Sequence, residues 1–386
     1  MATNQERTEF QSRVLTALGA NAYQLQELLK YNANKFRLSS LSLPNRFPLD
    51  DELFVSVWED YRFNTEKQRI MDVLKAPFRQ LYFPIRKGIS QDPEYQSAVR
   101  RGELATVYSQ ATGLEFNQPD EIRLVIHSSP AGKIPVLIIP NREDFENLLR
   151  ALTMRNEPEP IPRSLGAMTI SGFNNWDRID SYKRQWIESN SDSLANQTIW
   201  KQEFRILISN KELYQDRFIL VTEGPYSDVG ADRVGISENR WRQLSLDIRI
   251  NHESTHYFTK RMLGSMDNNL LDEIIADYMG LVVANGQFRA DWFNHFMGLE
   301  TYPHYRQGGR LQNYRGDPPL SEGSFQILQS LVIRAARNLE RFDENVPIIT
   351  HSLQTYGERI IRLANLSLEE MASDSFETRY EETVVI

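Results

Sequence analysis

Two histidines with a glutamate directly after the first are the residues of this sequence whose types and spacing most clearly point to chemistry. They stand in the stretch His252-Glu253-Ser254-Thr255-His256. On a helix, side chains at positions i and i+4 project from one face about one turn apart, so both histidines could bind the same metal ion. The glutamate could reach a water molecule activated by that ion and act as a general base. The stretch therefore predicts a hydrolytic zinc site.

A second group of acidic residues follows soon after and offers a third metal ligand. Glu273 and Asp277 share one face of a helix predicted over residues 269–284, with the small residues Ala276 and Gly280 beside them. Small residues would let this helix approach the histidine helix closely. Carboxylates on a helix face without a nearby lysine or arginine are costly to bury unless they find a partner. We therefore expect these acids to face the metal.

The histidine motif lies in residues 237–264, which contain no proline and no glycine before Gly264. Ser237 is a suitable N-cap, and Gly264 stands where the glycine after a helix end is usually found. Apolar residues recur at a spacing of four up to the histidines, which predicts a helix. Apolar residues at 244–250 also alternate with polar ones, which would suit a strand. We favour one continuous helix because the turn-forming residues lie only at its ends.

The composition excludes several other kinds of site. The chain has no cysteine, so disulfides, thiol nucleophiles and cysteine-rich zinc ribbons are excluded, and a metal site must use histidine and carboxylate ligands. The net charge of -8 argues against a nucleic-acid partner. The polar N-terminus and the lack of an apolar run of about 20 residues predict neither a signal peptide nor a membrane span. We therefore expect a soluble, cytoplasmic protein without a membrane partner.

The histidine motif and the acidic helix form one pattern, His252-Glu253-x-x-His256 followed by Asp272-Glu273-x-x-Ala276-Asp277. This pattern resembles the zinc signature of the gluzincin metallopeptidases, the thermolysin-like class. The resemblance implies three Zn²⁺ ligands: His252, His256 and Glu273. It also implies that Glu253 is the general base and that Asp277 orients His252. The signature covers residues 252–277, and the chain as a whole is similar to a bacterial family that carries it.

A loop predicted over residues 299–318 is the expected source of a further catalytic group. Thermolysin-like enzymes use a downstream tyrosine or histidine to stabilise the oxyanion, and the resemblance implies the same here. The loop contains Tyr302, His304, Tyr305 and Tyr314, together with three arginines. We name Tyr305 and His304 as candidate catalytic residues. An ordinary surface loop with packing tyrosines fits the sequence equally well.

The rest of the sequence predicts a helix-rich α+β protein in two parts. Three prolines within residues 156–162 indicate a domain boundary. We expect residues 1–159 to form a mixed α/β domain of unknown role. Residues 160–386 would then form a zincin-like metallopeptidase domain.

Individual elements of both parts can be predicted. Apolar spacing predicts a helix over residues 5–36, and strands are predicted over 121–128 and 134–139 with a hairpin turn between them. A strand over 217–222 is either an ordinary sheet strand or an exposed edge strand that could hold an extended peptide. The acidic tail from residue 367 is expected to be partly loose or to dock as a last element.

Three functions remain open from the sequence. The first is a zinc peptidase that acts on a peptide or protein substrate. The second is a catalytically silent binding or scaffold protein whose fold is supported by zinc. The third is a zinc hydrolase of a non-peptide amide. The same ligands would serve all three, so only the substrate can distinguish them.

Overall fold

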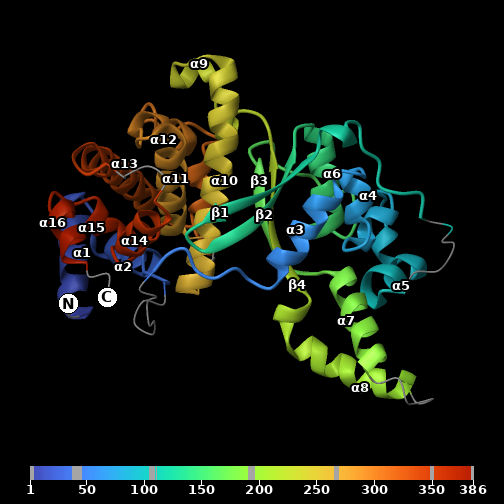
Figure 1. Cartoon of the computed structure of the whole chain (residues 1–386). Coiled ribbons are helices and arrows are strands. Elements are labelled where there is room, and N and C mark those ends of the chain that lie inside the picture. The colour runs from blue at the N-terminus through green and yellow to red at the C-terminus, as the bar shows by residue number, and fades with distance from the viewer. Residues whose placement is uncertain are drawn as a thin grey trace. The chain divides into compact units, whose positions relative to one another are not determined.

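The computed structural model describes residues 4–36, 46–103, 109, 111–189, 196–264, 269–347 and 352–383. Within these residues the chain is a helix-rich α+β protein with one four-stranded sheet (Figure 1). It divides into two compact units. The first comprises Met1–Leu49, Ser129–Ala131 and Pro225–Ile386, and the second comprises Asp50–Ser128 and Gly132–Gly224. In sequence, the second unit is therefore an insertion into the first.

The sheet of the second unit has the strand order β1-β2-β4-β3. Its strands are β1 (Arg123–Ser129), β2 (Gly132–Ile139), β3 (Ala167–Asn174) and β4 (Gln215–Thr222). β4 pairs in parallel with β2 and antiparallel with β3. The strands predicted over 121–128, 134–139 and 217–222 are confirmed. The alternative that 217–222 forms an edge strand is wrong, because its apolar run from Phe218 to Val221 is buried between two neighbours.

β3 lies in a stretch where the glycines and asparagines predict turns. Its pairing with β4 shifts register between Ser171 and Phe173, and Gly172 between them has a φ of +72°. A glycine with positive φ is typical of a β-bulge, after which the strand continues to pair. The glycine therefore marks an irregularity inside the strand rather than the end of one.

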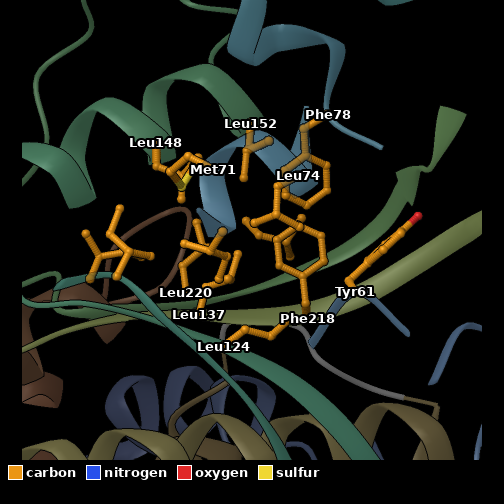
Figure 2. Packing of buried hydrophobic residues seen from close by; sticks show 14 of the residues in the cluster. Tyr61, Met71, Leu74, Phe78, Leu124, Leu137, Leu148, Leu152, Phe218 and Leu220 are labelled. Carbon is orange, nitrogen blue, oxygen red and sulfur yellow. The ribbon is translucent and has the colours of Figure 1, made fainter. Parts of the chain in front are cut away.

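The core of the second unit forms where helices cover the sheet. These helices are α3 (Phe54–Asn64), α4 (Ile70–Leu74) and α6 (Arg142–Thr153), while α5 (Pro93–Arg101), α7 (Trp176–Ser189) and α8 (Asn196–Ser209) lie outside this core. Both α3 and α6 contact β2 and β4. Figure 2 shows the apolar side chains of this core, among them Met71, Leu74, Leu148, Leu152, Leu137, Phe218 and Leu220.

The proline-rich segment, where the sequence predicts a domain boundary, lies within the second unit. Asn156 is fully buried, and its side-chain amide donates to the carbonyl of Phe83 at 2.9 Å. The carboxylate of Glu157 accepts from the backbone amide of Ser90 at 2.9 Å. The segment is thus held against other parts of its own unit.

The first unit is built from two helices at the start of the chain and from the helices that follow residue 225. They are α1 (Asn4–Ala17), α2 (Ala22–Tyr31), α9 (Ala231–Val234), α10 (Glu238–Leu263), α11 (Leu270–Asn285), α12 (Ala290–Met297), α13 (Glu322–Asn345), α14 (Leu353–Ala364), α15 (Leu368–Met371) and α16 (Phe376–Glu382). None of the helices that the structure describes is both long enough and apolar enough to cross a membrane. Figure 1 shows α1 and α2 beside α15 in this unit.

The N-terminal helices pack against the C-terminal tail. Instead of the single helix predicted over residues 5–36, there are two, because Gly19 has a φ of +93° and Asn21 caps α2. Arg7 pairs with Glu370 at 3.0 Å, and the buried carboxylate of Glu369 accepts from α1 and from the end of α2. Of the two expectations for the tail, docking is therefore the one that the structure shows for its described residues.

α10 is one continuous helix with the predicted caps. The Ser237 side chain accepts from the backbone amide of Arg240, and Gly264 adopts a left-handed φ of +67°. The strand alternative for residues 244–250 is therefore wrong. α10 packs along α11, which confirms the helix predicted over residues 269–284 and brings the two halves of the sequence pattern together.

Candidate metal centre

Three side chains from α10 and α11 meet in a buried cluster: His252, His256 and Glu273. One potential ligand atom from each lies within 4.8 Å of the others. The Nε2 atoms of the two histidines are 3.1 Å apart. The two carboxylate oxygens of Glu273 lie 3.5 Å from Nε2 of His252 and 3.5 Å from Nε2 of His256. The three residues that the sequence pattern proposes as ligands are therefore in contact with one another.

The geometry of this cluster fits a metal ion. Zinc–nitrogen bonds are about 2.0–2.1 Å long, so two nitrogens on one tetrahedral zinc ion lie roughly 3.4 Å apart. The separation of 3.1 Å between the Nε2 atoms is close to that value. Two imidazole nitrogens and a carboxylate form a donor set that suits zinc and leaves one position open for a non-protein ligand.

The outer nitrogen of each histidine contacts a buried aspartate. Nδ1 of His252 lies 3.0 Å from Oδ1 of Asp277, and Nδ1 of His256 lies 3.0 Å from Oδ2 of Asp272. A carboxylate at Nδ1 holds the proton there, which leaves the lone pair of Nε2 free to bind a metal. Asp277 lies where the resemblance implies. The sequence pattern assigns Asp272 no separate role, although its position directly before Glu273 in the first turn of α11 is a signal that could have identified it.

Buried charges around the cluster also favour a cation. Burial, with a contribution from His256, lowers the pKa of His252 to about 4. Burial opposes the charged form of His256 too, but the carboxylates of Asp272 and Glu273 hold its pKa well above the ordinary value. Burial would raise the pKa of Glu273, yet the charge of His256 lowers it overall. A divalent cation would therefore replace the proton of His256 in balancing these carboxylates.

Gly280 allows α11 to approach α10 beside the cluster. A Cβ atom at this position would lie 2.9 Å from the carbonyl oxygen of Ile248 and 3.5 Å from Cβ of His252. Real Cβ atoms do not tolerate the first of these distances without movement. The close approach expected from the small residues on α11 is therefore confirmed at Gly280.

Replacing Gly280 with alanine should push α11 away from α10 and separate Glu273 from the histidines. We expect the free energy of unfolding to fall by about 1–3 kcal/mol, as for other overpacked cores, and zinc affinity to fall with it. Chemical denaturation and zinc titration measure the two effects. Gly323→Ala is the matched control, because a Cβ atom there meets only the end of the flexible Gln24 side chain. Wild-type stability and zinc affinity in Gly280→Ala would contradict this prediction.

Glu253 lies on α10 directly after His252 and is half-buried. Its carboxylate is one of the charges that raise the pKa of His252 against the effect of burial. It is therefore close enough to the cluster to act on the ring electrostatically.

Neither Tyr305 nor His304 contacts the cluster in the part of the chain that the structure describes. The hydroxyl of Tyr305 donates to the carbonyl of Gly309 at 2.6 Å and accepts from a backbone amide of the same loop at 3.0 Å. His304 is exposed, and its backbone pairs with Thr301. Tyr305 is thus held inside its own loop. Among the described residues, His304 has no contact with the three residues of the cluster.

Two other residues of the same loop contact Glu273 of the cluster or the neighbouring Asp277. They belong to the short helix η7 (Arg310–Tyr314). Arg310 donates to the carboxylate of Asp277. Tyr314 is buried, and its pKa is raised by burial and, in addition, by the charge of Glu273 and a hydrogen bond to it. The predicted loop therefore contributes to the site, but through Arg310 and Tyr314.

A tyrosine before α10 completes the surroundings of His252. Tyr226 lies in the turn η6 (Tyr226–Asp228), and its hydroxyl donates to Oδ1 of Asp277 at 2.6 Å. The hydroxyl oxygen of Tyr226 is also 3.1 Å from Nδ1 of His252. The sequence shows this residue only as part of a turn after a strand, well before the histidine motif. We find no signal in the sequence alone that could have identified it.

The N-terminal helix α2 supports the segment that carries η7. The hydroxyl of Tyr31 donates to the carbonyl of Tyr314. At the start of α13, the carboxylate of Glu27 accepts from the backbone amide of Ser321 at 2.7 Å and from its hydroxyl at 2.6 Å. Residues from the start of the chain therefore fix both ends of the stretch from η7 to α13.

When the chain is compared with known protein families, one family matches nearly its whole length. The match covers residues 13–375, a range that includes every residue of the cluster. The chain belongs to DUF7005, a family of unknown function. None of the curated proteins and none of the solved structures compared with the chain matches it. Membership of DUF7005 therefore assigns no activity, and any function has to be argued from the cluster itself.

Proposed function

We propose that the chain is a zinc-dependent hydrolase that cleaves peptide bonds with a gluzincin-like site. The observation that carries this proposal is the pairing of each histidine with its own buried carboxylate. Asp277 and Asp272 each lie 3.0 Å from an outer nitrogen, His252 Nδ1 and His256 Nδ1 respectively, while both Nε2 atoms face Glu273. This arrangement prepares two imidazoles as inward-facing ligands.

The number of ligands supports a catalytic rather than a structural zinc site. Structural zinc sites are usually closed by four protein ligands, whereas catalytic sites use three and leave a position open. Among the described residues, the group that could hold a metal consists of His252, His256 and Glu273. A zinc ion bound there would polarise a carbonyl group and activate a water molecule.

The chain's own residues supply the other steps of the proposed reaction. Glu253 takes the proton from the attacking water and later delivers it to the leaving amine. Tyr314 donates its one hydroxyl proton to Glu273 in the metal-free site; once Glu273 binds zinc, that proton would turn to the oxyanion, the role for which the sequence suggested Tyr305 and His304. Arg310 keeps Asp277 in place against His252.

Metal analysis combined with digestion of a peptide library tests the proposal. We expect about one zinc ion per chain, and peptide cleavage that stops when a chelator removes the metal and returns when zinc is added. Bound zinc without hydrolysis of any peptide would instead favour a zinc-supported binding or scaffold protein. A chain that binds no zinc even after zinc is supplied would overturn the proposal.

A further inference from the structure

We propose that Tyr226 is a positioning residue for the metal site, one that fixes the proton of His252 on Nδ1 and so directs the lone pair of Nε2 toward the metal. The inference rests on the proposed function, because it assumes that the cluster binds zinc. It adds a residue from outside the sequence pattern to the set that controls metal affinity.

The proton positions around Tyr226 lead to this inference. A tyrosine hydroxyl has a single proton to donate. That proton is committed to Oδ1 of Asp277, 2.6 Å away, so the phenol oxygen can only accept from His252 Nδ1 at 3.1 Å. Nδ1 also lies 3.0 Å from Oδ1 of Asp277, which is an acceptor as well. Facing two acceptors, Nδ1 must carry the proton.

Arg310 holds both acceptors in place. It donates from one nitrogen to Oδ2 of Asp277 and from another to the hydroxyl of Tyr226 at 3.2 Å. A third contact, to the hydroxyl of Ser227 at 3.1 Å, ties the same guanidinium to the turn that carries Tyr226. Charge-assisted bonds of this kind are strong and directional. Arg310 thus holds the phenol of Tyr226 and the carboxylate of Asp277 in fixed positions beside the imidazole of His252.

The turn that carries Tyr226 is itself anchored to the histidine helix. The backbone amide of Tyr226 donates to the hydroxyl of Ser245, at 3.0 Å, and Arg249 donates to the carbonyl of Pro225 at 2.7 Å. Ser227 and Asp228 both have left-handed backbones, with φ of 52° and 58°. Such conformations cost energy in residues other than glycine and persist only where the surroundings enforce them. The phenol is therefore positioned by α10, the helix that carries His252.

A purely structural role, in which Tyr226 only fills the core, is the competing explanation. Tyr278 offers a matched control for it within the same unit. Its buried hydroxyl donates to Asp343 at 2.9 Å and accepts from Arg359 at 2.7 Å, so it also joins an aspartate and an arginine. These contacts do not involve either histidine. Removing the hydroxyl of Tyr278 should cost stability without changing the metal site.

Competitive zinc titration of the full chain tests the inference. We expect Tyr226→Phe to bind zinc 10- to 100-fold more weakly, about the effect of losing an outer partner of a metal ligand, and Tyr278→Phe to bind as the wild type does. Thermal unfolding should show a lower Tm for both. Wild-type zinc affinity in Tyr226→Phe would overturn the inference and leave the zinc site standing. A wild-type chain that binds no zinc would overturn the proposed function, and the inference with it.

A second variant covers the case in which Tyr226→Phe does not fold. Ser245→Ala keeps the phenol but removes the acceptor that anchors the backbone amide of Tyr226. We expect zinc affinity to fall in the same direction by a smaller factor, because the phenol is held less firmly. Unchanged zinc affinity in Ser245→Ala would then count against the positioning role.

Discussion

Glu253→Gln should abolish peptide hydrolysis while the chain keeps its zinc. The amide has nearly the shape of the carboxylate but cannot accept a proton from water. Loss of a general base typically lowers the rate roughly 10²- to 10⁴-fold. Glu253 is not among the three residues that form the metal-holding group, so the zinc content should not change. The measurements are initial rates on a peptide that the library digest identifies, and the zinc content of the same preparation.

The control for this prediction is Glu238→Gln, the same change at an exposed position in the first turn of α10. It should leave both the rate and the zinc content at wild-type values. Two outcomes would contradict the proposed role of Glu253. One is a Glu253→Gln enzyme with wild-type rates, and the other is a loss of zinc together with activity, which would make Glu253 a ligand rather than a base.

His256→Ala should remove the metal and destabilise the first unit strongly. The imidazole lies between the buried Asp272, at 3.0 Å, and the largely buried Glu273, at 3.5 Å. Those acids raise its pKa well above the ordinary value, despite the opposing effect of burial. Breaking a buried ion pair by removing one partner costs about 3–5 kcal/mol, because the remaining charge is left without compensation. The loss of a ligand should also reduce zinc binding below detection.

Chemical denaturation of metal-free protein separates these two effects, since the wild type without zinc still has the imidazole. His295→Ala, on α12 and not a member of the metal-holding group, is the control and should retain the full zinc content. If His256→Ala still bound one zinc per chain, His256 would not be a ligand. If its stability without metal equalled that of the wild type, the buried acids would not depend on the imidazole.

The meeting of His252, His256 and Glu273 could be predicted from the sequence because their positions follow from local rules. A helix with a serine N-cap and a C-terminal glycine places His252 and His256 on one face whatever surrounds it. Glu273 follows soon after in the sequence. It lies on a helix, α11, whose small residue Gly280 permits close contact with α10. These features depend on nearby sequence, and the structure bears out the helices and the meeting of the three side chains.

The rest of the site depends on contacts between distant residues, which local patterns do not encode. Tyr314 and Tyr305 stand in the same loop with similar neighbours, and only the folded backbone decides which of them turns to Glu273. Tyr226 is brought to Asp277 by bonds between its turn and α10. The sequence also gives no hint that α2 packs beside α13, because apolar helices near the start of a chain can join any unit.

The contact between α2 and the start of α13 has a consequence for synthesis of the protein. Glu27 and Ser321 are separated by 294 residues, so α2 leaves the ribosome long before its partner exists. The inserted unit, which draws on residues 50–224, has all of its sequence available earlier and can fold first. Until residues 314–321 emerge, the segment that carries Arg310 and Tyr314 lacks its support from α2. An unfinished chain therefore cannot present the complete centre, so the proposed hydrolysis should begin only once α2 has met the stretch from η7 to α13.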